Sequence, residues 1–347
     1  MRQRHEPRSA YAAAGVDTLA KSAVVRRIQE VGRCTAIPGV ESGLADFGGV
    51  FAIEAAGLGP DVLLVASIDG VGTKLRVAFA TGIHDTVGYD LVNHSVNDIL
   101  TTGARPLFFL DYVACGRLEP TVLEAVVSGI VRGCREAGCA LLGGETAEMP
   151  GHYPPGEYDL AGCIVGAVAR RDFVDGRDVK AGDAVLGLVS HGLHTNGFSL
   201  VRRVFEGVPY DHFFPELGTT LGVELLRTHR CYLPEVRRLR EGGIRINGMA
   251  HITGGGLLDN IPRVLPAGLG ARLAYGTWPV PSIFLLVQSR GNVSFHEMCH
   301  VFNLGLGYIL IVAPEEVEHA RAVLPELLHV GEVVPAPEGP RVRVVQS

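Results

Sequence analysis

The chain has 347 residues, of which 47% are hydrophobic and 20% are charged, and it contains 45 glycines. This composition is that of a globular protein with a sizeable core, and it excludes a disordered chain. The formal net charge of −6 leaves no basic footprint for nucleic acid, and no apolar run reaches the roughly 18 residues that a membrane span needs. We therefore expect neither a nucleic-acid partner nor a membrane partner.

The N-terminus and the cysteines indicate the compartment. Residues 1–15 are basic but lack the apolar stretch of a secretory signal, so a cytoplasmic location is the default expectation. The seven cysteines are odd in number and form no C-x-x-C pair. We expect them to be reduced core residues rather than disulfides or zinc ligands.

Strands and helices alternate in the first part of the chain. Branched and aromatic residues mark the strands, and Gly138 marks the end of one amphipathic helix. Strands are predicted at 50–55, 62–68, 106–115 and 158–170, and helices near 21–31, at 85–102 and at 119–137.

The segment 170–183 is charged and rich in turn residues, which indicates a domain boundary. A second series follows, with strands predicted at 184–189 and 305–313 and helices near 198–205, 221–227 and 314–324. The fold class predicted from this pattern is α/β (α+β), with two domains at residues 1–170 and 171–347.

The strand at 62–68 is followed by an acidic residue, two glycines and a lysine. Glycines let the backbone approach phosphate oxygens, Lys74 can neutralise them, and Asp69 can hold Mg²⁺. The spacing is not that of a P-loop. The alternative is a strand followed by an ordinary turn. The candidate residues are Asp69, Gly70, Gly72, Thr73 and Lys74.

The helix at 85–102 carries short polar side chains at positions i, i+4, i+7 and i+8, which share one face. They are Asp90, His94, Asn97 and Asp98. Such a face differs from a solvated Lys/Glu surface and suits oxygen coordination of a cation. The alternative is a polar face exposed to solvent.

A third candidate stretch begins at Leu141, where an apolar strand is expected to end in Gly143 and Gly144 and to be followed by Glu145. Acids after a glycine pair at a strand end are typical of a cation or phosphate site. Glu145 is therefore a candidate metal ligand.

The strand at 184–189 leads into a loop with His191, His194, Thr195 and Asn196, after which a helix begins. The free N–H groups of the helix start favour an anion, and either histidine could act as acid or base near neutral pH. The alternative is a Thr/Asn helix cap with surface histidines.

Of two further motifs, one is a candidate phosphate site and the other is not expected to bind metal. Gly254, Gly255 and Gly256 precede a helical pattern and offer a second backbone cradle for phosphate. His296-Glu297-Met298-Cys299-His300 has the spacing of a zinc protease motif, but no third ligand follows nearby, so a zinc site is not expected.

In their order and spacing these motifs resemble the phosphoribosylformylglycinamidine cyclo-ligases, also called aminoimidazole ribonucleotide synthetases. The resemblance runs from about Tyr11 to the C-terminal strand, and "GGETAEMPG" and "HTNGFSL" are its most specific strings. It implies a two-domain fold in which the N-terminal halves of two subunits pair into a β-barrel. It further implies a homodimer with ATP in a cleft at the dimer interface.

The resemblance also implies the reaction and the residues that serve it. ATP phosphorylates the amide oxygen of formylglycinamidine ribonucleotide, and the resulting iminophosphate closes to aminoimidazole ribonucleotide with release of ADP and phosphate. The reaction needs Mg²⁺, and K⁺ is a candidate helper. Lys74, His194 and Asn196 are implied to be catalytic, and Asp69, Asp98 and Glu145 to hold the metal. The implied ATP contacts are Asp69, Gly70, Gly72, Thr73, Lys74, Asn97, Asp98, Gly143, Gly144 and Glu145, and the implied substrate contacts are Thr195, Gly254, Gly255 and Gly256.

Some positions depart from the family pattern. Ala45 and Asp46 replace glycines, Gln29 replaces a lysine, His191 replaces a serine, and Asn93-His94-Ser95 replaces Ala-Met-Cys. These departures concern ATP affinity and metal preference rather than the fold. They leave two alternatives open, a non-catalytic nucleotide-binding paralogue and a sister phosphotransferase with another small substrate.

Overall fold

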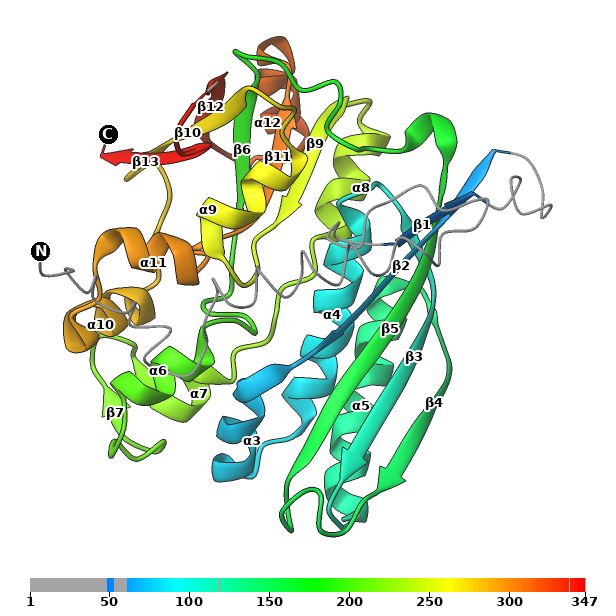
Figure 1. Cartoon of the computed structure of the whole chain (residues 1–347), viewed down its shortest axis with the longest axis vertical. Coiled ribbons are helices and arrows are strands. Elements are labelled where there is room, and N and C mark those ends of the chain that lie inside the picture. Colours follow the sequence, from blue (N-terminus) through cyan, green and yellow to red (C-terminus); the bar gives the residue numbers. More distant parts are fainter. Residues whose placement is uncertain (1–48, 53–60, 118, 337, 347) are drawn as a thin grey trace, which may run out of the picture.

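The computed structural model describes residues 49–52, 61–117, 119–336 and 338–346. The helix predicted near residues 21–31 and the departures at Gln29, Ala45 and Asp46 lie outside these residues. The described structure contains two large sheets and one short two-stranded sheet, and helix α4 (Asp85–Leu100) runs between the two large sheets (Figure 1).

The N-terminal half forms a five-stranded sheet with the order β1-β2-β5-β3-β4. β3 and β4 are parallel and connected by α5, whereas the other neighbouring strands are antiparallel. The elements are β1 (Gly49–Ala52), β2 (Val62–Gly70), α3 (Leu75–Thr81), α4, β3 (Arg105–Cys115), α5 (Pro120–Ala137), β4 (Ala140–Glu148) and β5 (Tyr158–Ala169), with a 3₁₀ turn at Gly72–Lys74.

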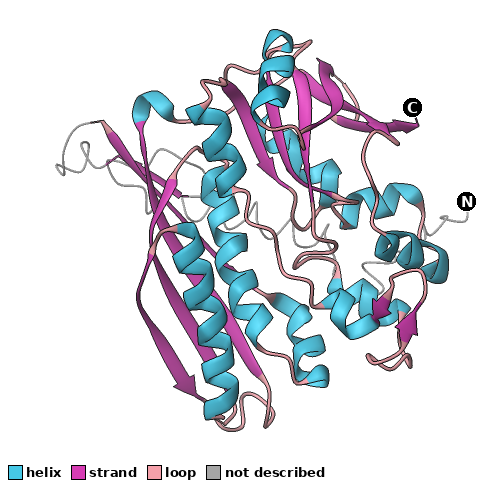
Figure 2. Cartoon of the chain, turned by 180° about the vertical axis from the view of Figure 1, so that it is seen from behind, coloured by secondary structure: helices cyan, strands magenta, loops and turns pink. Residues whose placement is uncertain are grey.

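Helices α4 and α5 cover one face of this sheet (Figure 2). Every second residue of β5, beginning with Tyr158, is buried, because alternate side chains of a strand point to opposite faces. The two helices approach closely at Gly88, where a Cβ atom would lie 2.0 Å from the carbonyl oxygen of Val126. The packing therefore fixes α4 firmly against the sheet.

No described helix covers the opposite face of the five-stranded sheet, which is drawn in front of α4 and α5 in Figure 1. Apolar side chains are exposed there, including Ile68 at 72% and Leu142 at 62%, together with Leu110 and Tyr112. An exposed apolar patch of this kind marks an interaction surface.

The C-terminal half forms a six-stranded sheet with the order β13-β10-β12-β6-β11-β9. All seven residues of β11, which lies between β6 and β9, are buried. In the described residues no helix has the length and apolarity that crossing a membrane requires. The elements are β6 (Ala184–Val189), α6 (Phe198–Val204), β7 (Phe213–Phe214), β8 (Thr219–Thr220), α7 (Leu221–Leu225), α8 (Leu233–Glu241), β9 (Ile246–His251), α9 (Gly256–Asn260), β10 (Leu269–Tyr275), α10 (Ser282–Gly291), α11 (Phe295–Val301), β11 (Leu306–Val312), α12 (Val317–Val323), β12 (Leu328–Pro335) and β13 (Val342–Gln346).

Most predicted elements in the described residues are confirmed to within a few residues, and the mixed α/β class is correct. The predicted end of a strand at Gly143 and Gly144 is wrong, since β4 continues to Glu148. The strand continues because its later residues pair with β3, with Glu145 opposite Tyr112. The six cysteines within the described residues are free, as expected.

Candidate active site between the two sheets

The polar face of α4 is buried, so its interpretation as a solvated surface is wrong. Three side chains on it bind the backbone of residues 229–232, which belongs to the other half of the chain. Asp90 accepts a hydrogen bond from the His229 N–H at 2.6 Å, and Asn93 donates to the His229 carbonyl at 2.7 Å. Asn97, which was predicted to contact ATP, donates to the Arg230 carbonyl and accepts from the Tyr232 N–H. Both ends of its side-chain amide are therefore engaged.

Lys74 does not lie at an open phosphate site, contrary to the sequence prediction. Its side chain is completely buried and its Nζ lies 2.6 Å from Oδ2 of Asp90. The same Nζ donates to the carbonyls of His194 at 3.1 Å and Arg227 at 2.8 Å. The cation of Lys74 is therefore used to join the turn after β2 to two loops of the C-terminal half.

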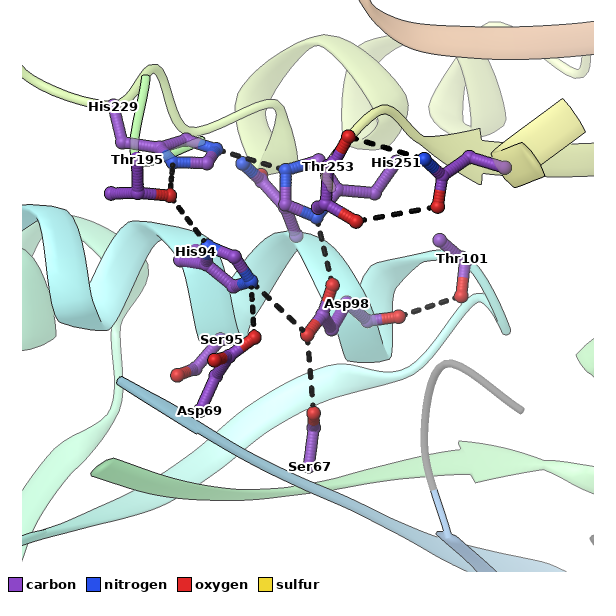
Figure 3. Close-up of polar contacts among 12 residues, drawn as sticks. Ser67, Asp69, His94, Ser95, Asp98, Thr101, Thr195, His229, His251 and Thr253 are labelled. Carbon is purple, nitrogen blue, oxygen red and sulfur yellow. Dashed lines mark hydrogen bonds and ion pairs between the residues drawn. The ribbon is translucent and has the colours of Figure 1, made fainter. Parts of the chain in front are cut away.

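Asp69 and Asp98, two of the predicted metal ligands, lie on either side of His94 (Figure 3). His94 Nε2 is 2.6 Å from Asp69 Oδ2 and 3.7 Å from Asp98 Oδ2. Ser67 donates to Asp98 Oδ2 at 3.2 Å. Asp69 and Ser67 reach α4 because both point from β2 to the helix-covered face of the sheet.

The cluster continues into the C-terminal half through four further hydrogen-bonding contacts (Figure 3). His94 Nδ1 is 2.9 Å from Thr195 Oγ1, which is 3.3 Å from His229 Nδ1. His229 Nε2 is 2.9 Å from His251 Nε2, and His251 Nδ1 is 2.8 Å from Asp98 Oδ1. The described loops thus close a ring of polar contacts that begins and ends on α4.

The histidines of this cluster differ in charge. Burial would lower the pKa of His94, but the carboxylates of Asp69 and Asp98 outweigh it and raise that pKa to about 9. Burial holds the pKa values of His194 and His229 well below the ordinary value. Burial also lowers the pKa of His251, although Asp98 opposes this effect. At neutral pH His94 is therefore protonated, whereas the imidazoles of His194, His229 and His251 are neutral.

The predicted substrate loop lies directly against this cluster. His194 is buried, has the left-handed φ of 60°, and stacks on His229 with ring centroids 4.0 Å apart. Its Nε2 accepts from the His191 N–H at 3.1 Å, whereas its Nδ1 is buried without a hydrogen-bond partner among the described residues. A Cβ on Gly254 would lie 3.4 Å from Asn196 Oδ1, so the glycine run and the loop are neighbours.

The remaining predicted residues divide into two groups. Thr73 follows the exit of β2, where Gly72 has a φ of 68°, and its Oγ1 is 3.2 Å from Ser199 Oγ in the helix after the substrate loop. Gly255 and Gly256 start α9 with φ values of 97° and 57°. Thr73 therefore lies at the junction of the two halves, whereas Gly256 lies against the backbone of Cys299 and Phe302.

Glu145 does not lie beside Asp69 and Asp98 within one chain. Strands β5 and β3 stand between β2 and β4, so the two backbones are about 14 Å apart. Glu145 also pairs with Tyr112 and shares its open face, whereas Asp69 points to the helices. Gly143 and Gly144 lie on the same distant edge strand.

Two members of the cluster escaped the sequence prediction. His251 ends β9 immediately before the glycine run, so the string "HITGGG" offered a signal. His229 lies in the loop before α8 and carried no motif. The sequence gives no indication that the backbone of His229 or the imidazole of His251 would meet α4, because both contacts join residues more than 130 positions apart.

Comparison with known proteins shows which family models this chain matches. Residues 48–168 match the family described as AIR synthase related protein, N-terminal domain. Residues 180–342 match the corresponding C-terminal domain. The two matches together span most of the chain and cover both halves of the site.

Individual relatives point the same way. The phosphoribosylformylglycinamidine cyclo-ligase of Desulfitobacterium hafniense (strain DSM 10664 / DCB-2) is 50% identical over 314 residues, covering 90% of this chain and 92% of the relative. That of Bordetella avium is 48% identical over 346 residues and covers 98% of each chain. The crystal structure of the hydrogenase maturation protein HypE in complex with ATP has a TM-score of 0.61 at 22% identity, with 83% of this chain and 82% of that chain covered. This last likeness shows the fold alone.

Proposed function

The chain belongs to the family of phosphoribosylformylglycinamidine cyclo-ligases, and from this membership we propose how its own residues carry out the reaction. The enzyme uses ATP to close formylglycinamidine ribonucleotide to aminoimidazole ribonucleotide, with release of ADP and phosphate. This is a step of purine biosynthesis, and we propose that it takes place in the cytoplasm.

The chemistry requires that a formyl amide oxygen become a leaving group. Transfer of the γ-phosphoryl group to that oxygen gives an iminophosphate, and attack by the amidine nitrogen then closes the ring. Phosphoryl transfer depends on positioning and charge neutralisation more than on a covalent nucleophile. We therefore assign acids and backbone groups to ATP and the loop at 194–196 to the substrate.

The ATP side is proposed to lie at the exit of β2. Gly70 and Gly72 offer backbone to the phosphates, and Thr73 stands at the same turn. Because Lys74 is buried, we propose that it positions the turn and the substrate loop instead of touching phosphate. Asn97 is likewise proposed to be a positioning residue.

Asp69 and Asp98 fit a divalent cation, which would neutralise phosphate charge during transfer. Their carboxylates converge on one point beside His94, and the side chain of Asp69 is 45% exposed, so an ion can enter from solvent. We propose that these two acids hold the Mg²⁺ that accompanies ATP.

The substrate side is proposed to include His194, Thr195 and Asn196. His194 is neutral because burial lowers its pKa, so it can accept a proton or orient the amidine. Its neighbour Asn196 lies against Gly254, which supports a role of the run from Gly254 to Gly256 in holding the ribose phosphate.

We propose that two copies of the chain pair through the open face of the five-stranded sheet, as the exposed Ile68 and Leu142 support. Glu145 is exposed on that same face. It is proposed to serve a site that the second copy completes, since it is remote from Asp69 within its own chain. The boundary between the two domains is proposed at Arg170 and Arg171.

The observation that carries the assignment is the convergence of Asp69 and Asp98 with the loop 194–196 at one junction. The test uses the full chain with Mg²⁺-ATP and formylglycinamidine ribonucleotide, with and without K⁺. Aminoimidazole ribonucleotide and phosphate should appear in equal amounts. Binding of ATP without turnover, or phosphate release without ring closure, would overturn the proposal.

A further inference from the structure

Two cysteines lie where helix α5 ends and strand β4 begins. Cys134 is in the last turn of the helix, which ends at Ala137. Gly138 then adopts the left-handed φ of 69°, which glycine accepts because it has no Cβ atom. Cys139 follows, and β4 begins at Ala140. The function proposed above uses neither thiol, so the pair is open to a second role.

Two backbone hydrogen bonds define the geometry of this turn. The N–H of Gly138 donates to the carbonyl of Arg135 at 3.2 Å, and the N–H of Cys139 donates to the carbonyl of Cys134 at 2.9 Å. This is the pairing of a Schellman motif, in which the side chains at the two ends of the outer hydrogen bond commonly touch. Cysteine occupies both of these positions here.

The two thiols are paired, as this motif leads one to expect. A side-chain hydrogen bond joins Cys134 and Cys139. A disulfide requires two backbones that lie close together and two side chains that face each other. The outer backbone hydrogen bond meets the first requirement, and the bond between the thiols meets the second.

The two thiols differ in exposure and in charge. Cys134 is buried, whereas Cys139 is half-buried and lies between the exposed Gly138 and Ala140. The hydrogen bond that the Cys134 thiol donates lowers the pKa of Cys139, and the same bond raises the pKa of Cys134. A thiolate attacks an oxidant and a thiol does not. Cys139 is therefore the sulfur that an oxidant reaches and meets first.

The other cysteines in the described part of the chain are less suited to such a reaction. Burial raises the pKa of Cys115 and of Cys163, and it raises the pKa of Cys231 and of Cys299 to about 12. Cys231 precedes α8 and interacts electrostatically with Cys139. It is therefore the competing partner that an experiment has to separate from Cys134.

We propose that Cys134 and Cys139 form a reversible disulfide on exposure to a hydroperoxide, with Cys139 as the attacking sulfur. Attack on hydrogen peroxide breaks its O–O bond and gives the sulfenic acid of Cys139. The hydroxide that leaves takes up the proton lost by Cys139 and becomes water. The sulfur of Cys134 then displaces the sulfenic oxygen, which leaves with the Cys134 proton as a second water. Two thiols are thereby oxidised, and one peroxide is reduced to two waters.

The test uses the full chain, reduced and freed of reductant. It is treated with a small excess of hydrogen peroxide, and the remaining thiols are blocked with N-ethylmaleimide. Trypsin cleaves after Arg135, between the two cysteines, so mass spectrometry should find peptides 133–135 and 136–170 joined. A second cleavage at glutamate removes Cys163 from the larger peptide. Dithiothreitol should separate the joined peptides.

The order of reaction is measured on the same protein in its reduced state. Iodoacetamide should alkylate Cys139 at least about tenfold faster than Cys134, because alkylation also requires the thiolate. Both measurements use the wild type. They therefore remain decisive even where a substitution of the buried Cys134 prevents folding.

Three variants assign the roles of the sulfurs. Cys134→Ser should leave a sulfenic acid on Cys139 that dimedone traps, because the thiol that resolves it is gone. In the reciprocal variant Cys139→Ser, dimedone should label Cys134 far less. Cys231→Ser is the matched control and should form the disulfide between Cys134 and Cys139 at the wild-type rate.

Other results would overturn the proposal. One is a wild type in which peroxide oxidises Cys139 without joining it to Cys134, or leaves both thiols unchanged. Another is a disulfide that joins Cys139 to Cys231 or to a second chain. Alkylation of Cys134 before Cys139 would contradict the assignment of Cys139 as the attacking sulfur.

Discussion

Lys74 and Asp90 form an ion pair of 2.6 Å in which both side chains are completely buried. Lys74 comes from the turn after β2, and Asp90 comes from α4. Because Lys74 also donates to the carbonyls of His194 and Arg227, the pair ties both halves of the chain together at the candidate site.

The first prediction concerns the stability that this pair confers. Lys74→Met leaves the Asp90 carboxylate buried without its cation, and removal of one partner of a buried pair costs roughly 3–5 kcal/mol. Urea unfolding should show a loss of that size in the free energy of unfolding.

The double variant Lys74→Met/Asp90→Asn is the control. It removes both charges while Asn keeps an acceptor for the His229 N–H, so it should lose less than the sum of the single variants. A single-variant cost below about 1 kcal/mol would show that the pair does not stabilise the junction.

The second prediction tests Asp98 as a metal ligand. Asp98→Asn should lower kcat for ring closure on the order of 100-fold, because a group that stabilises charge in phosphoryl transfer is weakened. Steady-state kinetics and a thermal unfolding curve are measured together. Asp85→Asn is the matched control, since Asp85 is exposed on the first turn of the same helix and should keep wild-type turnover. Near-normal kcat in Asp98→Asn would reject the metal assignment.

The third prediction separates catalysis from ATP binding at His194. His194→Ala should lower kcat by about 100-fold, as loss of an acid–base group does, while the Kd for ATP changes little. His191→Ala provides the comparison, because its backbone N–H still donates to His194 Nε2. Equal losses of turnover and ATP affinity would instead make His194 a structural residue.

The polar face of α4 shows how far the sequence predicts the site. Helical spacing alone places Asp90, His94, Asn97 and Asp98 together, and this holds in the structure. Their burial could not be predicted, because the covering groups come from residues 229–232 and from His251, far along the chain. Local pattern gives the face of a helix but not what packs on it.

The wrong prediction of a strand end before Glu145 has a different physical cause. Two glycines in succession usually end a strand, which made the acid after them resemble a group at a strand exit. In β4, Gly144 is accommodated inside the sheet, where a Cβ would lie 2.2 Å from Asp111 Oδ1. The strand therefore continues, and its alternation carries Glu145 to the open face.

The fourth prediction concerns acid stability. Burial keeps the pKa values of His194 and His229 well below the value of about 6.5 in an unfolded chain. Below about pH 6.5 the unfolded state binds protons that the folded state does not, so stability falls as pH falls. Each histidine contributes up to about 1.4 kcal/mol per pH unit.

The measurement compares wild type with His229→Asn by urea unfolding on both sides of about pH 6.5. The difference between the two proteins removes the contribution of all other titrating groups that the substitution leaves unchanged. The variant should lose less stability on acidification than the wild type. Parallel pH profiles would show that His229 is not held neutral in the folded protein.

The last prediction concerns self-association through the open face of the five-stranded sheet. Ile68→Lys places a charge on the exposed apolar patch and should weaken the dimer by at least about tenfold, equal to about 1.4 kcal/mol. Analytical ultracentrifugation over a range of concentrations measures this change. Leu285→Lys is the control, because Leu285 is 50% exposed on α10 and lies outside the patch.

Activity measured during dilution connects this dimer to the chemistry. If Glu145 completes the site of a second copy, kcat per chain should fall as the dimer dissociates, and Ile68→Lys should show the fall at higher protein concentration than Leu285→Lys. A wild type that sediments as a monomer at every concentration would reject the pairing. If kcat per chain stays constant while dilution dissociates the dimer, the interface is supported but Glu145 does not serve the site of the second copy.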